Sequence, residues 1–434
     1  MIGALAVAVA AESAIVVGGS HLVGLGGLAL TLVATAAWAF LAYDARVEQR
    51  APLVMIAIAV AFLVAIVVPP RGSHDLWAYV MYGRTVSVHH TSPYVHAPSD
   101  FPGDVFTARV AAGWRHAKSV YGPLFTAGSA VLTRIVGASA LRARLAFQAV
   151  AAISLAGALL LIWRAKHSAR ALAFVGLHPA AVIAVVNGGH NDALVGLAVI
   201  AGALLAARRR WIGSGFVLAL GILVKASAGL GLLAVAAWTW RRDRRGAIRL
   251  LLIAAATTIA AYVPAGLTAA RDVASAGNGN SRASAWDPIS SLLHPGTTAM
   301  VIGALAFTVI AAWRWSGSTE PSRTSLATMG AYLIGGVYVL PWYPAWALPT
   351  AALERRSRLA ALVGAHAAFL VAVYEYEAPA HETLRGVLGV VRSVLIQLAA
   401  WLTLVVFVSM SVGARRRNAR VETPRSTGSS ASGS

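Results

Sequence analysis

A polar segment, residues 70–118, contains residue types that can perform acid–base chemistry. Its first part reads Ser73-His-Asp-Leu-Trp-Ala-Tyr-Val-Met-Tyr-Gly-Arg84. If residues 75–86 are helical, Asp75, Tyr79 and Tyr82 share one face. A carboxylate placed in this way can accept the proton of a hydroxyl group as a general base. A helix N-cap or a solvated loop residue is the alternative, which position alone slightly favours.

Two further polar groups interrupt apolar sequence. In Gly188-Gly-His-Asn-Asp192, the glycines permit close approach of a ligand to the backbone, and His190, Asn191 and Asp192 could contact it. Capping of the next helix by Asn191 or Asp192 is the competing interpretation. Lys225 ends the apolar stretch 211–225. A charge at membrane depth indicates a functional site, here a counter-ion for a lipid phosphate, unless the lysine snorkels to the headgroups.

Three weaker candidates follow. Arg282, in the loop 269–297, could clamp a phosphate or belong to a simple connector. Trp342 and Tyr343, in Pro341-Trp-Tyr-Pro-Ala-Trp346, could stack on a sugar ring, although aromatic residues at this depth are more often interface anchors. The histidines of residues 89–116 match no ligand spacing, so we expect no metal and no cofactor.

The elements that position these residues are apolar and helical. Of the 434 residues, 58% are hydrophobic and 12% are charged, against about 25% charged in soluble domains. The pattern predicts an all-α, polytopic membrane protein of about 13–14 transmembrane helices. The expected spans are 2–17, 22–43, 52–69, 143–164, 170–186, 191–207, 211–225, 226–240, 248–268, 298–314, 326–341, 359–375 and 389–412, with a short segment near 343–353.

The placement of charge predicts orientation. The net charge is +20, but the arginines cluster at helix ends, at 208–210, 241–245, 355–358 and 415–417. This positive-inside pattern indicates cytoplasmic turns rather than a nucleic-acid partner. Residues 70–118 and 188–192 then face the other side. Residues 121–137 are expected to form an interfacial helix, with a true crossing as the alternative. One domain, 1–413, would contain the outer loop 70–142, and 414–434 would be a disordered cytoplasmic tail.

The order of these pieces resembles the integral-membrane GT-C glycosyltransferases that use polyprenyl-phosphate sugars. Within that class it is similar to the bacterial α-(1→6)-mannopyranosyltransferases of lipomannan and lipoarabinomannan assembly. The motifs that carry the resemblance are Asp75 with Tyr79 and Gly83-Arg84, Ser92-Pro93-Tyr94, Tyr121-Gly-Pro-Leu124, Gly188-Gly-His-Asn-Asp192, Leu223-Val-Lys225 and Pro341-Trp-Tyr343. No P-loop, dinucleotide fingerprint or nucleophile elbow competes with this interpretation.

The resemblance implies a reaction and roles. Asp75 would be the general base that deprotonates an acceptor hydroxyl for attack on C1 of mannose, with inversion to an α-linked product. Lys225, His190, Arg84 and Arg282 would offset the charge of the leaving phosphate. The residues implied to contact substrate are Tyr79, Tyr82, Tyr94, Tyr121, Asn191, Asp192, Trp342 and Tyr343. The expected partners are a polyprenyl-phosphate sugar donor, a glycolipid or polysaccharide acceptor and membrane lipids, at the extracytoplasmic face of a bacterial plasma membrane.

One difference from the family's motifs weakens the inference of which sugar and which acceptor the chain uses. The chain has Ser92 where the family commonly has aspartate before Pro-Tyr. A lipid or glycolipid transporter or flippase is the alternative function. It predicts internal repeats and broken helices near the midplane. A non-catalytic envelope assembly protein is a third interpretation, which leaves the clustered polar residues unexplained.

Overall fold

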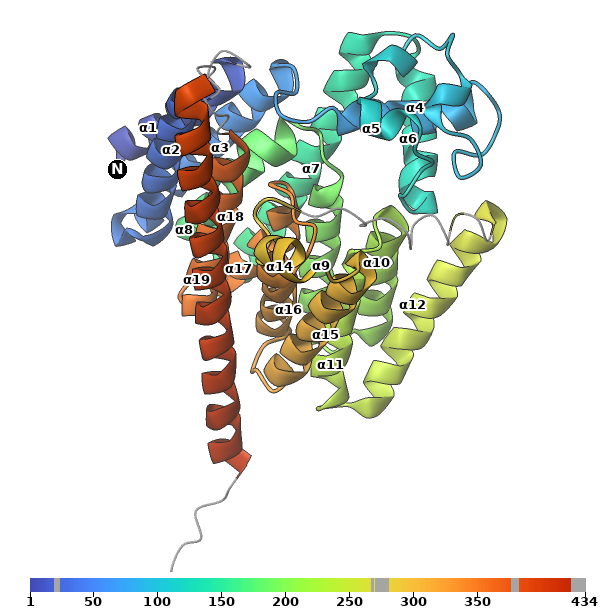
Figure 1. Ribbon diagram of the computed structural model, residues 1–434. Helices are drawn as coiled ribbons and strands as arrows, with labels where there is room; N and C mark the ends of the chain where they lie inside the picture. The colour runs from blue at the N-terminus through green and yellow to red at the C-terminus, as the bar shows by residue number, and fades with distance from the viewer. Residues whose placement is uncertain (19–23, 267–268, 270–280, 376–381, 423–434) are drawn as a thin grey trace, which may run out of the picture.

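The computed structural model describes residues 1–18, 24–266, 269, 281–375 and 382–422 (Figure 1). Within these residues every regular element is a helix, so the predicted all-α class is confirmed. The main helices are α1 (Ile2–Gly18), α2 (Leu25–Tyr43), α3 (Ala51–Val67), α4 (Asp75–Ser87), α6 (Pro123–Val136), α7 (Ala140–Lys166), α8 (Ala169–Gly176), α9 (Asp192–Ala207), α10 (Trp211–Val224), α11 (Ala228–Trp240), α12 (Arg244–Ala265), α14 (Asp287–Leu293), α15 (Thr297–Trp315), α16 (Pro321–Gly335), α17 (Leu348–Leu353), α18 (Arg358–Glu375) and α19 (Glu382–Glu422).

Short helical turns connect several of these helices. They are η2 (Ala45–Arg50), η3 (Pro98–Asp100), η4 (Thr107–Arg109), α5 (Ala112–Arg115), the π-helix η5 (Ala180–Val186) and η6 (Tyr343–Trp346). The predicted return segment near 343–353 corresponds to η6 and α17. Helix α19 continues to Glu422, into the tail for which we predict disorder, and residues 423–434 of that tail lie outside the described residues.

Six of the described helical stretches are long and apolar enough to cross a membrane: 25–43, 45–67, 140–166, 244–265, 297–315 and 389–413. A seventh candidate is α8 with η5, which together are bent by 45°. The other apolar helices, including α9, α10 and α11, are between 10 and 17 residues long. The sequence-based number of spans is larger because it counts these shorter helices as full crossings.

The buried core lies around α8, α9, α16 and α17, whose side chains are enclosed on nearly all sides. One close approach within it positions the site. A Cβ atom at Gly196 would lie 2.1 Å from the carbonyl oxygen of Ala345. Because glycine has no side chain, η6 can lie directly on α9. This contact brings the aromatic residues of η6 to the start of α9.

Three buried polar side chains stabilise the end of α3. Arg144 donates hydrogen bonds to the carbonyl oxygens of Ile66 and Val67. Gln148 and Asn187 both donate to the carbonyl oxygens of Ala65 and Val68. The last carbonyl groups of a helix have no partner within the helix, so such bonds stabilise its end. The chain therefore leaves α3 in a defined direction towards Asp75.

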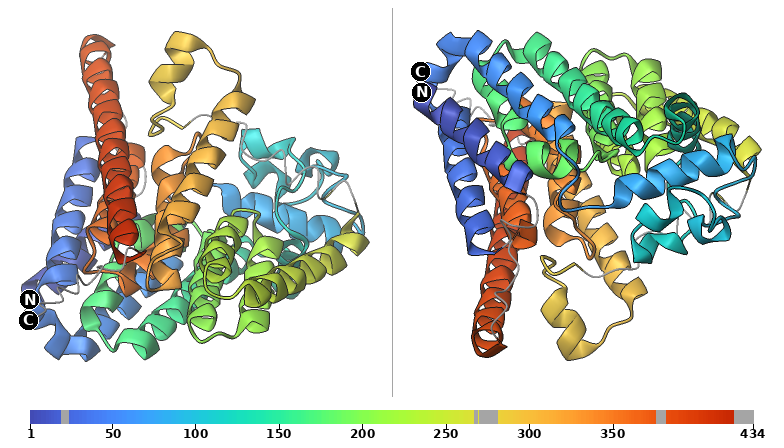
Figure 2. Two further views of the ribbon diagram at one scale, coloured as in Figure 1. Left: turned by 90° about the horizontal axis from the view of Figure 1, so that it is seen from below. Right: turned by 90° about the horizontal axis from the view of Figure 1, so that it is seen from above.

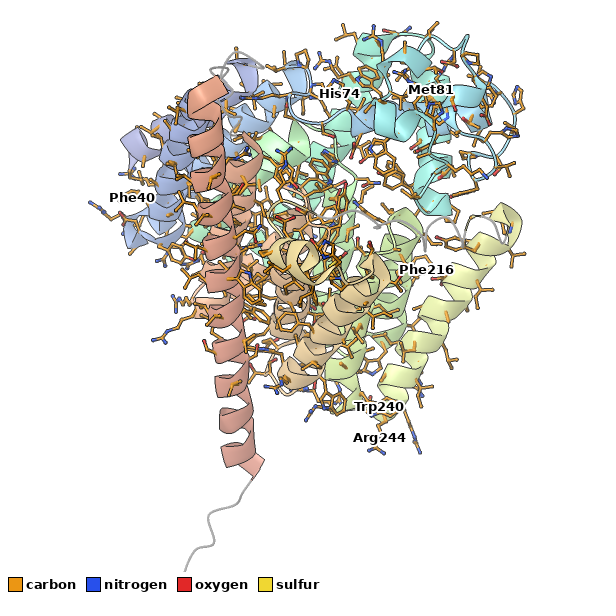
Figure 3. All side chains as sticks on the ribbon, viewed as in Figure 1. Phe40, His74, Met81, Phe216, Trp240 and Arg244 are labelled. Carbon is orange, nitrogen blue, oxygen red and sulfur yellow. The ribbon has the colours of Figure 1, made fainter. Side chains whose placement is uncertain are left out.

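Helices α4, α5 and α6 gather at one end of the molecule (Figure 1) and on one side of the helix bundle in both views of Figure 2. Helix α4 packs closely on α6, since a Cβ atom at Gly83 would lie 2.4 Å from the carbonyl oxygen of Ser129. In Figure 3, His74 and Met81 of this segment lie at the opposite end from Trp240 and Arg244. The polar loop and the arginine-rich turn 241–245 therefore lie at opposite ends of the molecule.

Candidate functional site

Asp75 is the first residue of α4, and the N-cap position belongs to His74. The backbone N–H of Asp75 donates to the Ser73 hydroxyl at 3.1 Å. The indole Nε1–H of Trp114 donates to Oδ1 of Asp75 at 2.9 Å. Asp75 is 9% exposed, so it is not a solvated loop residue. The structure instead holds its carboxylate with a side chain from a distant part of the loop.

The charge state of Asp75 depends on its surroundings. Burial raises the pKa of Asp75 to about 6, while the positive charge of Lys225 and the hydrogen bonds of Ser73 and Trp114 oppose this rise. The negative charge of Asp192 raises the pKa further. The charges of Lys225 and Asp192 therefore both act on the Asp75 carboxylate. With a pKa of about 6, Asp75 changes its protonation state slightly below neutral pH.

Lys225 and Asp192 form a buried ion pair near Asp75. The Lys225 ammonium donates to Oδ1 of Asp192 at 2.8 Å, and Trp346 Nε1–H donates to the same oxygen at 2.6 Å. The ammonium also lies 4.6 Å from the ring centroid of Tyr343, within the range of a cation–π interaction. Asp192 is fully buried, whereas the Lys225 side chain keeps 16% exposure. Lys225 is therefore the more exposed member of the pair.

His190 lies beside this pair. Its ring stacks on Trp342, with 3.9 Å between the ring centroids, and its Nδ1 lies 3.3 Å from the Tyr79 hydroxyl. Within the described residues, His190 Nε2, both amide atoms of Asn191 and Oδ2 of Asp192 are buried without a hydrogen-bond partner. Buried polar atoms of this kind are rare and costly. Their concentration over three consecutive residues indicates a place for a polar ligand.

Two glycines shape the backbone near His190 and Lys225, one by its conformation and the other by a close approach to a neighbouring segment. Gly189 has a φ of +64°, which glycine adopts without strain. At Gly122, the N–H donates to the carbonyl oxygen of Val224 at 3.0 Å, and a Cβ atom would lie 2.2 Å from the carbonyl oxygen of Leu223. The segment after Tyr121 is thus joined directly to the end of α10, next to Lys225.

The predicted tyrosines divide into two groups. The Tyr79 ring contacts Tyr121 edge to face, at 5.0 Å between centroids, and it also lies edge to face with His190 at 6.4 Å. Tyr82 donates its hydroxyl to the carbonyl oxygen of Ala117, and Tyr94 donates to the carbonyl oxygen of Tyr121. The hydroxyl groups of Tyr82 and Tyr94 therefore hold the loop in place.

The interactions of Arg84 and Arg282 are with residues other than Lys225 and Asp192. Arg84 lies about 14 Å along α4 from Asp75, and its Nε donates to both carboxylate oxygens of Asp104 at 2.9 Å. His89 Nε2 lies 2.8 Å from the same carboxylate. Arg282 is exposed, and its carbonyl oxygen accepts a hydrogen bond from Gln397.

Three residues that complete the site lie outside the set of candidates that the sequence predicts. Ser73 and Trp114 bond to Asp75, and Trp346 bonds to Asp192. Trp346 belongs to the aromatic motif Pro341-Trp-Tyr-Pro-Ala-Trp346, and that motif is the signal that could have identified it. Trp114 lies in the short helix α5, 39 residues from Asp75 in the chain, and no spacing rule links the two.

Two other features concern ligands. Among the residues with defined placement, no group of three or more His, Cys, Asp or Glu side chains is arranged to hold a metal ion. Cavities of about 550 and 680 Å³ lie at the arginine-rich end, where they are lined by residues such as Arg323 and Arg355, and neither is lined by Asp75 or Lys225.

Comparison with known proteins gives one family. The family model described as "Alpha-(1->6)-mannopyranosyltransferase, N-terminal domain" matches residues 2–242. This range includes Asp75, His190, Asp192 and Lys225, but ends before the aromatic motif of η6.

Two curated relatives are similar to this chain, and both are named Alpha-(1->6)-mannopyranosyltransferase A. The one from Mycobacterium tuberculosis is 27% identical over 340 residues, which cover 68% of this chain and 64% of that protein. The one from Corynebacterium glutamicum is 29% identical over 180 residues, which cover 39% of this chain and 36% of that protein. The chain thus matches less than two thirds of the length of either relative. No solved structure matches.

Proposed function

The chain belongs to the alpha-(1->6)-mannopyranosyltransferase family, and we propose that it transfers mannose from a polyprenyl-phosphate donor to a hydroxyl group of a glycolipid or polysaccharide acceptor. Membership in this family makes the protein an enzyme of the mannosyltransferase type. The nature of the donor, the acceptor and the membrane face are parts of the proposal. The apolar helices support a multi-pass membrane protein, in which a lipid-borne donor would reach the site from the bilayer.

Asp75 acts as the general base in this proposal. Its carboxylate takes the proton of the acceptor hydroxyl while the hydroxyl oxygen bonds to C1 of mannose. The bond between C1 and the phosphate oxygen breaks, and its electron pair leaves with the polyprenyl phosphate. Attack opposite to the leaving group inverts the configuration at C1, so a β-linked donor yields an α-linkage. The hydrogen bond from Trp114 holds the Asp75 carboxylate in one orientation.

Lys225 and His190 stabilise the leaving phosphate. A lysine ammonium has three donors, and Asp192 accepts from one of them, so the others can turn towards the phosphate. His190 contributes Nε2, which has no hydrogen-bond partner within the described part of the chain. Fixed donors beside a developing negative charge lower the barrier because they need no reorganisation during the reaction.

Trp342 and Tyr343 support the sugar. One face of Trp342 is occupied by His190, and Trp342 is only half-buried, so its other face can carry a pyranose ring. Tyr343 stacks on Trp346 with 4.3 Å between centroids and fixes the aromatic side of the site. Asn191 would then bond to sugar hydroxyls through its two unpartnered amide atoms.

One observation carries the proposal: a buried carboxylate, Asp75, lies within the electrostatic reach of the buried Asp192–Lys225 pair, although these residues come from three separate segments. The arginine-rich turn 241–245, which contains Arg244, lies at the other end of the molecule (Figure 3). By the positive-inside rule, the site then faces the extracytoplasmic side of the plasma membrane. A membrane-side reporter fused after residue 117 tests this orientation.

The activity is tested with Asp75→Asn, assayed in membranes with radiolabelled polyprenyl-phosphate mannose and envelope glycolipids. We expect transfer to fall at least about a hundredfold, because a general base contributes about 10²–10⁴-fold. Asp100→Asn is the matched control, since Asp100 lies in the same loop with an exposed side chain, and it should retain transfer. Normal transfer by folded Asp75→Asn would refute the role of Asp75 as base.

A further inference from the structure

A cationic cavity of about 550 Å³ lies at the end of the molecule opposite to Asp75. Its charged lining comprises Lys166, Arg323, Arg355 and Arg356 with Glu48 and Glu354. Glu48 and Asp75 lie just beyond opposite ends of α3, whose length is about 25 Å. The cavity is therefore separate from the proposed catalytic site.

The two carboxylates of the cavity are already engaged by the protein. Glu48 accepts hydrogen bonds from the Ser168 hydroxyl, the N–H of Ala169 and the guanidinium of Arg170. Glu354 accepts from the Ser322 hydroxyl at 2.7 Å. These hydrogen bonds hold the two carboxylates in the lining of the cavity. The other charged groups of the lining are positive, so the cavity favours binding of an anion.

Two arginines of the cavity, Arg323 and Arg355, differ in their partners. Arg355 donates a hydrogen bond to the carbonyl oxygen of Ala42, and its Nη2 lies 3.8 Å from Oε1 of Glu48, so its guanidinium is held at the cavity. Arg323 lies over the ring of Trp315, at 5.4 Å from the centroid, and its buried Nε has no partner among the residues described. Guanidinium groups held in this way recognise phosphate oxygens with good geometry.

Arg323 also lines a second cavity, of about 680 Å³, whose other lining residues include Arg358, Trp315, Leu359 and Met410. Met410 belongs to the stretch 389–413 of α19, a candidate membrane span. Val405, Val408 and Val412 on the same stretch are exposed, as expected of a surface facing lipid. A phosphate at Arg323 would therefore have apolar surface directly beside it for acyl chains.

We propose that these two cavities form a binding site for the phosphate of an anionic phospholipid headgroup. The phosphate binds among Arg323, Arg355 and the exposed cations Lys166 and Arg356, and the acyl chains lie along α19. Basic pockets between transmembrane helices at the positively charged face recognise anionic headgroups in this way. Among the described residues, those that line the two cavities differ from those that bond to Asp75 and Lys225, so lipid binding and mannosyl transfer can be measured separately.

The test uses the full-length protein in neutral detergent and measures lipid binding by native mass spectrometry, without donor or acceptor. The probes are short-chain phosphatidylglycerol, phosphatidylcholine of the same chain length, and inorganic pyrophosphate. The variant is Lys166→Gln with Arg356→Gln, both at exposed side chains. The control is Arg208→Gln with Arg245→Gln, which removes two exposed charges from other arginine-rich turns.

We expect one tightly bound phosphatidylglycerol per chain, with about 10- to 30-fold weaker binding in the variant. The control should bind within about twofold of the unaltered protein, and pyrophosphate should compete with phosphatidylglycerol. Equal losses in the variant and the control would overturn the site, as would equal affinity for phosphatidylcholine. Binding of pyrophosphate but not of phosphatidylglycerol would overturn the lipid as the source of the phosphate.

Discussion

Lys225 donates a hydrogen bond of 2.8 Å to the carboxylate of Asp192, across 33 residues of the chain. The two residues end and begin different helices, α10 and α9, and Trp346 from a third element bonds to the same carboxylate oxygen. A buried charge pair is stable only when both partners are present. The site therefore forms only when the packed helices bring Lys225, Asp192 and Trp346 together.

Lys225→Met should destabilise the protein by roughly 3–5 kcal/mol, because it leaves the buried Asp192 without its counter-charge. The double variant Lys225→Met with Asp192→Asn should recover most of this loss but should not recover transfer, since the phosphate would still lack its cation. Thermal unfolding in detergent and the transfer assay give the two readouts. Lys118→Met, at an exposed lysine of the outer loop, is the control. Recovery of transfer in the double variant would contradict the role of Lys225.

The rate of transfer should rise with pH, with an apparent pKa near 6. Burial raises the pKa of Asp75 to about 6, and only the deprotonated carboxylate accepts a proton, so activity is lost below this value and constant above it. In Trp114→Phe, the loss of a hydrogen bond that lowers the pKa should move the acidic limb upward by roughly half a unit to one unit.

The measurement is kcat/KM against pH for the unaltered protein and both tryptophan variants. Trp240→Phe is the control, because Trp240 lies at the opposite end of the molecule (Figure 3). An unchanged acidic limb in Trp114→Phe would show that Asp75 is not the group whose titration limits the reaction.

Gly122→Ala should destabilise the protein by roughly 1–3 kcal/mol, because the new methyl group would press on backbone atoms. A Cβ atom there would lie 2.2 Å from the carbonyl oxygen of Leu223, and the displaced chain would also move Lys225. Gly128→Ala is the matched control in α6, where a Cβ atom meets nothing within 4 Å. It should stabilise the helix by about 0.5–1 kcal/mol. Thermal unfolding of the two variants side by side decides this prediction.

Arg84→Gln and Asp104→Asn should both loosen the outer loop, because each breaks the ion pair between these largely buried side chains, and Asp104→Asn should loosen it at least as much because the carboxylate also contacts His89. Loss of one partner of such a pair costs roughly 3 kcal/mol. Limited proteolysis of residues 88–118 measures the loosening, and a double variant should add little to either single change. If Arg84→Gln alone raised KM for the donor, Arg84 would instead have the phosphate-binding role that the sequence predicts.

Local sequence located the helices around Lys225. The stretches expected to span the membrane at 211–225 and 226–240 form α10 and α11, which are shorter than a full crossing, and the helix assumed over 75–86 is present as α4. Their boundaries depend on residues that are neighbours in the chain, such as Lys225 and the apolar run before it. The span expected at 326–341 begins and ends earlier in the structure than the sequence predicts. Helix α16 begins at Pro321 and ends at Gly335, and its first turn contains polar residues such as Thr324, whose hydroxyl donates to the carbonyl oxygen of Trp315.

The sequence by itself therefore determined an all-helical membrane protein with an acidic residue, Asp75, at the start of a loop helix. Only the tertiary structure decided that Trp114 orients this carboxylate and that Trp346 and Lys225 share Asp192. Helix periodicity depends on residues three or four positions apart, so the sequence itself contains this pattern. These hydrogen bonds join residues 39, 154 and 33 positions apart, and such pairs meet only when the packed helices bring them together.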